Sequence, residues 1–320
     1  MPRPAPFFAE IADAPAGARA VWLDTPDGAR IRAALLGHGA RGTVLIFPGR
    51  TEYVEKYGPA ARELQARGWG CIAVDWRGQG LADRPLDDPA TGHVDRFVEY
   101  QHDVAALMEA LPGFDVARPL VLLGHSMGGA IGLRAVHGGL PVVAAAFSAP
   151  MWGISLSAVL RPTAWALTAV AGPLGLGRRY APSTRPASYV AGTAFELNQL
   201  TRDPERYAWM QAQLAAHPEL GLGGPSLTWL GEALREARAL RRRPAPDLPS
   251  LTFLGGRERI VDPAAIRARV RSWPGAALHV EPDGWHEMMM ERTDIRTRVF
   301  DAACAFFDAH RAPGAEDRGA

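Results

Sequence analysis

The chain has 320 residues, of which 48% are hydrophobic and 22% are charged, so it carries enough apolar material for one large domain. Its formal net charge is +1, and it has no zinc-finger or basic-helix spacing, which argues against nucleic-acid binding. Cys71 and Cys304 lie far apart in apolar surroundings. We therefore expect core thiols, with neither a disulfide nor a metal site.

The sequence has no signal for secretion or for crossing a membrane. Residues 1–20 lack the basic region followed by an apolar stretch that is typical of a signal peptide, which predicts a cytoplasmic protein. The longest uncharged run, at 162–177, is shorter than the roughly 20 residues needed to span a bilayer. Gly172 and Pro173 also interrupt it.

The first half of the chain alternates between strand and helix patterns. Residues 20–37 alternate around the turn signal Thr25-Pro26-Asp27-Gly28, which predicts a hairpin. Short apolar runs follow at 42–49, 70–76, 119–126 and 142–150, and helical patterns separate them at 53–68, 96–111 and 127–139. Such runs are typical of strands buried on both faces of a parallel sheet. We predict an α/β fold with a mostly parallel sheet flanked by helices.

The alternation stops near Pro150 and resumes at 249–262, with a helix at 263–273, a strand at 277–284 and a closing helix at 296–310. The interrupting stretch contains helical patterns at 195–216 and 226–243. We predict a core made of residues 1–150 and 245–312, a helical cap inserted at 151–244, and a disordered tail at 313–320.

Ser126 is the candidate nucleophile. It lies in Gly124-His125-Ser126-Met127-Gly128, where a buried strand meets a helix, and this junction is what a nucleophile elbow requires. The small residues Gly124 and Gly128 leave room for the tight turn. The alternative is a glycine-rich turn that cradles phosphate, but the lysine or further spaced glycine of such turns is absent.

A serine nucleophile needs a histidine base and an acid that orients it. In α/β folds with a nucleophile elbow, the three residues follow one another along the chain as nucleophile, acid and histidine. His286 directly follows the last predicted strand. Two carboxylates follow the strand before it, Glu258 and Asp262. We favour Glu258, the first acidic residue past the strand end. Asp262 is the alternative acid, although Pro263 beside it indicates a helix cap.

Attack on an ester places negative charge on the carbonyl oxygen, so amide donors must face that position. The architecture offers two candidates, the backbone amides of Met127 and of Arg50. Gly49 keeps the Arg50 loop close to the sheet.

With these residues in place, the chain resembles α/β-hydrolases of the monoacylglycerol lipase and bacterial lysophospholipase branch. The segments that carry the resemblance are FPGRTEYVEKY, VDWRGQGLADRP, GHVDRFVEYQHDV and GHSMGG, and LTRDPERY and LGGPSLTWLGEA within the predicted cap. They resemble the inner-membrane-associated bacterial lysophospholipases in particular. Relatives usually have His-Gly at Pro48-Gly49 and Asp at Glu258, whereas the lysophospholipase group resembles this chain at both positions.

The resemblance implies hydrolysis of the acyl ester of a lysophospholipid or monoacylglycerol through an acyl-enzyme on Ser126, with no cofactor and no metal. The apolar stretch 157–177, next to Arg178 and Arg179, could hold acyl chains or contact an anionic bilayer. The lipid head group, the acyl-chain length and the oligomeric state are left open.

Three alternatives remain at this stage. One is a broad carboxylesterase. Another is an aminopeptidase that resembles proline iminopeptidases, which would need an acidic anchor for the substrate amine among cap residues such as Glu196, Glu205 and Glu232. The third is a sensor that binds a ligand without turnover.

Overall fold

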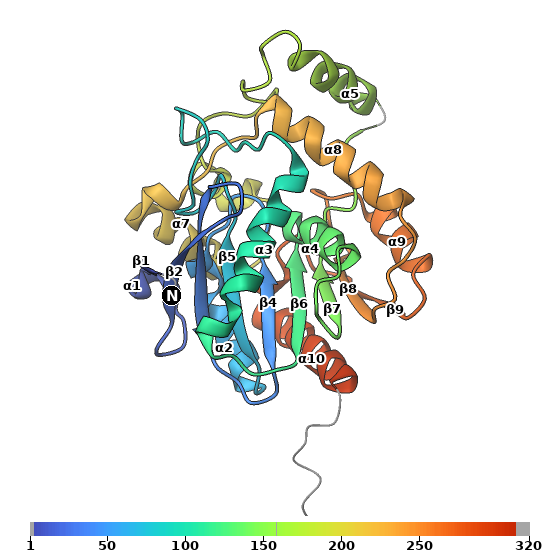
Figure 1. Cartoon of the computed structure of the whole chain (residues 1–320). Helices are drawn as coiled ribbons and strands as arrows, with labels where there is room; N and C mark the ends of the chain where they lie inside the picture. The colour runs from blue at the N-terminus through green and yellow to red at the C-terminus, as the bar shows by residue number, and fades with distance from the viewer. Residues whose placement is uncertain (1–2, 158, 312–320) are drawn as a thin grey trace, which may run out of the picture.

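The computed structural model describes residues 3–157 and 159–311, so the predicted tail at 313–320 lies outside the described residues. A nine-stranded sheet forms its centre, in the order β1-β2-β3-β5-β4-β6-β7-β8-β9 (Figure 1). The strands are β1 (Arg3–Ala5), β2 (Arg19–Asp24), β3 (Arg30–Gly37), β4 (Thr43–Phe47), β5 (Gly70–Asp75), β6 (Leu120–His125), β7 (Ala145–Ser148), β8 (Ser250–Gly255) and β9 (Ala276–Glu281).

The sheet is antiparallel at one side and parallel elsewhere. β1, β2, β3 and β5 pair antiparallel in that order, whereas β5, β4, β6, β7, β8 and β9 pair in parallel. β2 and β3 form the predicted hairpin, closed by a hydrogen bond from Gly28 N to Thr25 O at 2.9 Å. β7 is shorter than the apolar run 142–150 that predicted it.

Helices cover both faces of the sheet (Figure 1). α3 (Tyr100–Ala110) packs against α4 (Met127–His137), and α2 (Gly58–Ala66) packs against α10 (Thr293–His310). α9 (Pro263–Arg271) contacts β9, and the short α1 (Ala9–Ala12) lies near the N-terminus. In the parallel part, β4 to β8 are buried throughout because both of their faces are covered, whereas the edge strand β9 is mostly half-buried. The predicted α/β fold class is confirmed.

The segment between β7 and β8 lies above the sheet edge at which β6 ends (Figure 1). We call residues 149–249 the insertion. Its helices are α5 (Leu160–Ala171), α6 (Tyr189–Gly192), α7 (Pro204–Ala216) and α8 (Leu227–Arg242), with short 3-10 turns at Phe195–Leu197 and Pro218–Leu220. No helix in the described part of the chain has the length and hydrophobicity that a membrane crossing requires.

The helical pattern at 195–216 is only partly helical in the structure, because two capping interactions divide it. The side chain of Asn198 accepts hydrogen bonds from the amides of Leu200 and Thr201, which turns the backbone away from the helical path. Asp203 then caps α7, which begins at Pro204.

Candidate active site

Ser126 lies at a strained junction between β6 and α4. Its φ of 49° and ψ of −116° fall outside the regions that L-residues ordinarily adopt. Its N–H donates to the Ser148 carbonyl at 3.0 Å. Its own carbonyl accepts from the amides of Gly129 at 2.9 Å and Met151 at 2.8 Å. A strained serine at a strand-to-helix turn is the geometry of a nucleophile elbow.

The glycines on either side of Ser126 allow two close backbone approaches. A Cβ atom at Gly128 would lie 1.9 Å from the carbonyl oxygen of Phe47 at the end of β4, and one at Gly124 would lie 3.0 Å from the Gly128 carbonyl oxygen. Any side chain at Gly128 would therefore push the elbow away from β4. This contact brings the elbow against the loop that carries Arg50.

His286 follows β9 and is hydrogen-bonded to Glu258, which follows β8. Its Nδ1 lies 2.8 Å from Glu258 Oε2. Glu258 Oε1 accepts from the amides of Ile260 at 2.6 Å and Val261 at 3.2 Å. Burial opposes ionisation of this carboxyl, but His286 and the two amides hold its pKa below the usual value. The carboxylate is thus suited to orient the imidazole with Nε2 available for proton transfer.

Asp262 has a different environment. Its Oδ1 accepts from the amides of Ala264 at 2.9 Å and Ala265 at 3.3 Å and so caps the N-terminus of α9. The structure therefore brings Glu258 to His286 and places Asp262 at a helix end.

Ser126 and His286 line the same cavity, at the carboxyl edge of the parallel strands. The ring centroids of His286 and of His125, which precedes the serine, are 4.9 Å apart. Within the described residues, no hydrogen bond joins the Ser126 hydroxyl to His286. Such hydrogen bonds are often long in ligand-free enzymes and shorten when substrate binds.

The two predicted amide donors belong to adjoining segments. Met127 is the first residue of α4, where N–H groups have no partner inside the helix. The Arg50 amide, in the turn after β4, has no acceptor in the described part of the chain. The Arg50 side chain donates to the Gly223 carbonyl at 2.7 Å and lies 5.1 Å from the Trp229 ring centroid. Those contacts fix the loop against the insertion.

The cavity has a volume of about 580 Å³. Its floor is formed by the loop after β4, by Ser126 and by His286. Its walls come from residues of the insertion between 183 and 225 and from Ile260. The described residues of 157–177, which we expected to offer an apolar surface for acyl chains, do not line the cavity. They form α5 and its flanks, and α5 packs on the outer side of α8 (Figure 1).

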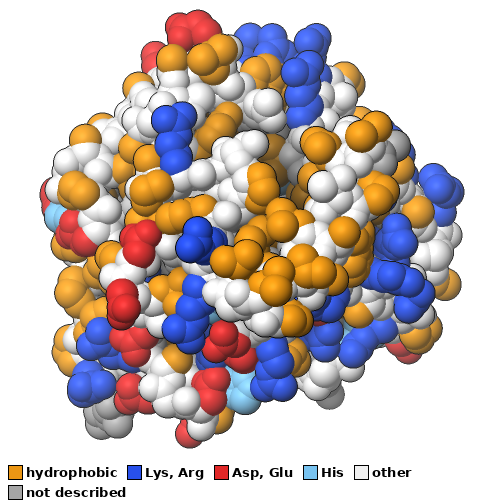
Figure 2. Space-filling model, turned by 90° about the horizontal axis from the view of Figure 1, so that it is seen from above, with side chains coloured by type: hydrophobic (Ala, Val, Ile, Leu, Met, Phe, Trp, Pro, Cys, Tyr) orange, Lys and Arg blue, Asp and Glu red, His pale blue; other side chains and the backbone are white. Residues whose placement is uncertain are grey.

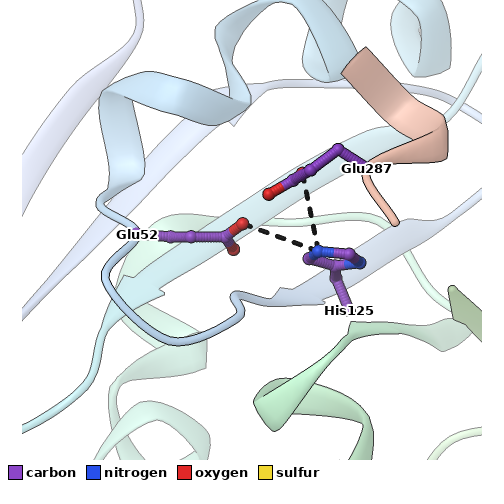
Figure 3. A group of neighbouring side chains, drawn as sticks. All are labelled: Glu52, His125 and Glu287. Atoms are coloured by element: carbon purple, nitrogen blue, oxygen red, sulfur yellow. Dashed lines mark ion pairs between the residues drawn. The ribbon is translucent and has the colours of Figure 1, made fainter. Parts of the chain in front are cut away.

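Four buried side chains beside the cavity were not predicted as a group. Glu52, His125 and Glu287 point toward one another (Figure 3), and the ammonium group of Lys56 lies between the two carboxylates. They come from the loop after β4 and the 3-10 turn Val54–Tyr57 that follows it, from the last residue of β6 and from the loop after β9. Apart from Glu52 and Lys56, which are four residues apart, no local pattern joins them. The only sequence signal is position, since His125 precedes Ser126 and Glu287 follows His286.

The sheet order, the elbow and the histidine–carboxylate pair define an α/β-hydrolase. Residues 38–293 match the Hydrolase_4 family, described as serine aminopeptidase, S33, and the chain belongs to this family. The alignment with lysophospholipase L2 of Escherichia coli K12 is 31% identical over 289 residues and covers 84% of this chain and 81% of that protein. The alignment with monoacylglycerol lipase of Mycolicibacterium smegmatis is 24% identical over 255 residues and covers 78% of this chain and 83% of that protein. The predicted resemblance to the lysophospholipase and monoacylglycerol lipase branch is confirmed.

Solved structures show the same fold. A soluble variant of monoglyceride lipase from Saccharomyces cerevisiae, in complex with a substrate analog, superposes with a TM-score of 0.73 at 19% identity, covering 96% of this chain and all of that one (100%). Monoacylglycerol lipase from Paleococcus ferrophilus gives a TM-score of 0.67 at 19% identity, with 87% and 98% covered.

Proposed function

We propose that this protein hydrolyses the acyl ester of a single-chain lipid, a lysophospholipid or a monoacylglycerol. The observation that carries the proposal is the strained Ser126 beside the His286–Glu258 pair, at the floor of a cavity that the insertion covers. The named activities of the curated relatives support it, because they are lysophospholipases and a monoacylglycerol lipase.

In the proposed mechanism, Ser126 Oγ attacks the acyl carbon while His286 Nε2 takes its proton. Glu258 stabilises the imidazolium through Nδ1. The amides of Arg50 and Met127 donate to the oxyanion. His286 then protonates the leaving alcohol, which leaves the acyl group on Ser126. Water, deprotonated by His286, releases the fatty acid and restores the serine. No step needs a metal or an organic cofactor.

The shape of the cavity suits one acyl chain. Apolar side chains from the insertion and from the loop after β8 line one part of it, namely Val190, Leu200, Met210, Leu214 and Ile260. We propose that residues 151–244 act as the cap that shields this chain from water, and that residues 1–150 and 245–312 form the catalytic core.

The charges at the cavity favour a substrate with a phosphate group. Arg50 and Arg185 both line it, and neither guanidinium pairs with a carboxylate among the described residues. Burial lowers the pKa of Arg50 to about 10, which still leaves it cationic at neutral pH. A lysophospholipid could place its phosphate near these two side chains.

The aminopeptidase alternative has weaker support, although the family description names that activity. An aminopeptidase would need a carboxylate in the cap to bind the substrate amine. Within the described part of the insertion, no acidic side chain lines the cavity, and this includes Glu196, Glu205 and Glu232. Glu232 instead accepts from the Phe97 amide and from Arg235.

We further propose that α5 contacts the membrane surface. Leu160 and Leu174, at the two ends of α5 and its flank, are 57% and 65% exposed. Hydrophobic side chains gather on this face with basic side chains beside them (Figure 2), and Arg178 and Arg179 follow the segment directly. An apolar surface flanked by arginines is suited to an anionic bilayer.

The test is an assay of lysophosphatidylcholine, a monoacylglycerol and a proline arylamide, run on the wild type and on Ser126→Ala with a fluorophosphonate probe. We expect the probe to label only the wild type, which hydrolyses lysophosphatidylcholine fastest and the arylamide not at all. Labelling without hydrolysis of either lipid would exclude the lipase function. Binding without any turnover or labelling would favour the sensor.

A further inference from the structure

Five buried polar side chains lie directly beneath the proposed catalytic residues. Glu52, Lys56, Tyr57, His125 and Glu287 are each at most 5% exposed. We call these five residues the buried charge network. Charged groups are rarely buried in this way unless each has partners, because their removal from water is costly.

Lys56 is at the centre of the network. Its Nζ lies 2.5 Å from Glu52 Oε1 and 2.6 Å from Glu287 Oε1. His125 Nε2 lies 3.6 Å from Glu52 Oε1 and 3.5 Å from Glu287 Oε2. The second oxygen of Glu52 accepts from the Tyr57 hydroxyl and from the Gly49 amide. Three of the four carboxylate oxygens of the network thus accept a hydrogen bond, and the fourth, Glu287 Oε2, faces the His125 ring nitrogen.

Two carboxylates and an imidazole this close together are also the donor set of a metal site. The ammonium group of Lys56 already lies between the carboxylates, and it would repel a divalent cation. Burial disfavours the charged ammonium, but Glu287 and Glu52 raise the pKa of Lys56 above its usual value, so it stays protonated. The lysine therefore supplies the cation of this site.

The network joins the three segments of the proposed active site. Glu52 holds the Gly49 amide in the loop whose next residue, Arg50, is a proposed oxyanion donor. His125 precedes the nucleophile Ser126, and Glu287 follows the base His286. Lys56 bridges the loop that carries Glu52 to the loop that carries Glu287.

We propose that Lys56 is a positioning residue, which holds the oxyanion loop and the His286 loop at the distance from Ser126 that catalysis requires. This inference rests on the proposed hydrolase function. Lys56 and Glu287 also line the cavity, but their charged groups are paired with each other and with Glu52. They act through Gly49 and His286, and a loop misplaced by about 1 Å can lower the rate about a hundredfold.

The first test compares Lys56→Met, Lys56→Arg and the control Arg62→Met, which removes an exposed arginine that pairs with Asp13. The kcat of each variant is measured on a soluble ester, p-nitrophenyl butyrate, and divided by the fraction of sites that a fluorophosphonate titrates. We expect Lys56→Met to lower kcat about tenfold to a hundredfold with little change in KM. Lys56→Arg restores most of the rate, and Arg62→Met matches the wild type.

If Lys56 only stabilises the fold, Lys56→Met lowers the fraction of sites that the fluorophosphonate titrates and leaves kcat per titrated site unchanged. That outcome would overturn the inference. If the wild type neither labels with the fluorophosphonate nor hydrolyses any ester, the proposed function fails instead. The two failures are therefore distinguishable.

Glu287→Gln is the second variant, because it keeps the side-chain volume if Lys56→Met does not fold. Loss of the Glu287 charge removes one of the two carboxylates that hold Lys56, so we expect kcat per titrated site to fall about tenfold with little change in KM. An unchanged kcat per titrated site would overturn the inference.

The wild-type protein provides a third readout, because Lys56 is the only lysine in the chain. With ¹⁵N-labelled lysine, one side-chain ammonium resonance is expected. If the network couples to the active site, phosphonylation of Ser126 shifts this resonance. A resonance that stays in place when the serine is modified would refute the coupling.

Discussion

Glu258 and His286 lie on loops that follow adjacent strands, and their side chains meet at 2.8 Å between Oε2 and Nδ1. Asp262, only four residues beyond Glu258, caps α9. The local backbone explains this difference, because the amides of Ile260 and Val261 turn back onto Glu258 and hold its carboxylate toward the imidazole.

Replacement of the two carboxylates should therefore have unequal effects. Glu258→Gln removes the negative charge that stabilises the imidazolium and allows the wrong tautomer, so we expect kcat to fall by about 10³- to 10⁴-fold. Asp262→Asn keeps a good helix cap and should retain nearly full activity. Steady-state kinetics of both variants on one ester distinguish them. Loss of turnover in Asp262→Asn alone would mean that the acid is Asp262.

The fold and the Ser126 and His286 positions could be predicted because their signals are local. A glycine on each side of Ser126 at a strand end, and a histidine just after the last strand, are short patterns with a structural meaning. The choice of acid was weaker, since Glu258 and Asp262 are both acidic residues on one loop and Glu258 was favoured only as the first of them past the strand end. Their environments depend on the path of that loop, which no spacing reveals.

The residues of the cavity wall and of the buried charge network could not be predicted from the sequence, for a different reason. Lys56 and Glu287 are 231 residues apart and meet only because β4 and β9 end at the same edge of the sheet. The apolar composition of residues 157–177 indicated an acyl-chain surface, yet the cavity is lined by residues around Val190, which form no long apolar run.

Acyl-chain length should depend on Val190, a half-buried residue of α6 that lines the cavity. Val190→Phe fills part of the acyl space, so we expect kcat/KM for a long-chain lysophospholipid to fall about tenfold or more, with butyrate ester hydrolysis little changed. Val170→Phe is the matched control, since Val170 is exposed on α5 outside the cavity. Equal losses on both substrates would indicate misfolding, and no loss would place the acyl chain elsewhere.

Membrane contact through α5 can be tested without affecting the cavity. We expect the wild type to sediment with phosphatidylglycerol vesicles more than with phosphatidylcholine vesicles. Replacing both Leu160 and Leu174 by Ser should abolish most of this binding, since each buried leucine contributes about 1–3 kcal/mol. Leu197→Ser, at another exposed leucine, should bind normally. Hydrolysis of a soluble ester should be the same in all three proteins. Undiminished sedimentation of the double variant would rule out α5 as the contact.

The stability of the fold should depend on pH through His137 at the end of α4. Its Nε2 lies 3.3 Å from a guanidinium nitrogen of Arg269. Burial, Arg269 and two further arginines lower the pKa of His137 from 6.5 to about 4. The unfolded chain therefore binds a proton that the folded chain does not, between about pH 6.5 and 4. Stability should fall as the pH drops through this window.

The thermal midpoint, measured at intervals from pH 7 to pH 4, provides the check. The wild type should lose more stability over this range than His137→Asn, which cannot take up the proton. If the two proteins lose stability in parallel, His137 is not the responsible group.

In the proposed mechanism Ser126 carries the acyl group of the covalent intermediate. Peptide mass spectrometry after reaction with a fluorophosphonate that bears a long alkyl chain identifies the residue that reacts. We expect one adduct per chain, on the peptide that contains Ser126, with no adduct and no lipid hydrolysis in Ser126→Ala. An adduct on another serine, or hydrolysis that persists in Ser126→Ala, would contradict it.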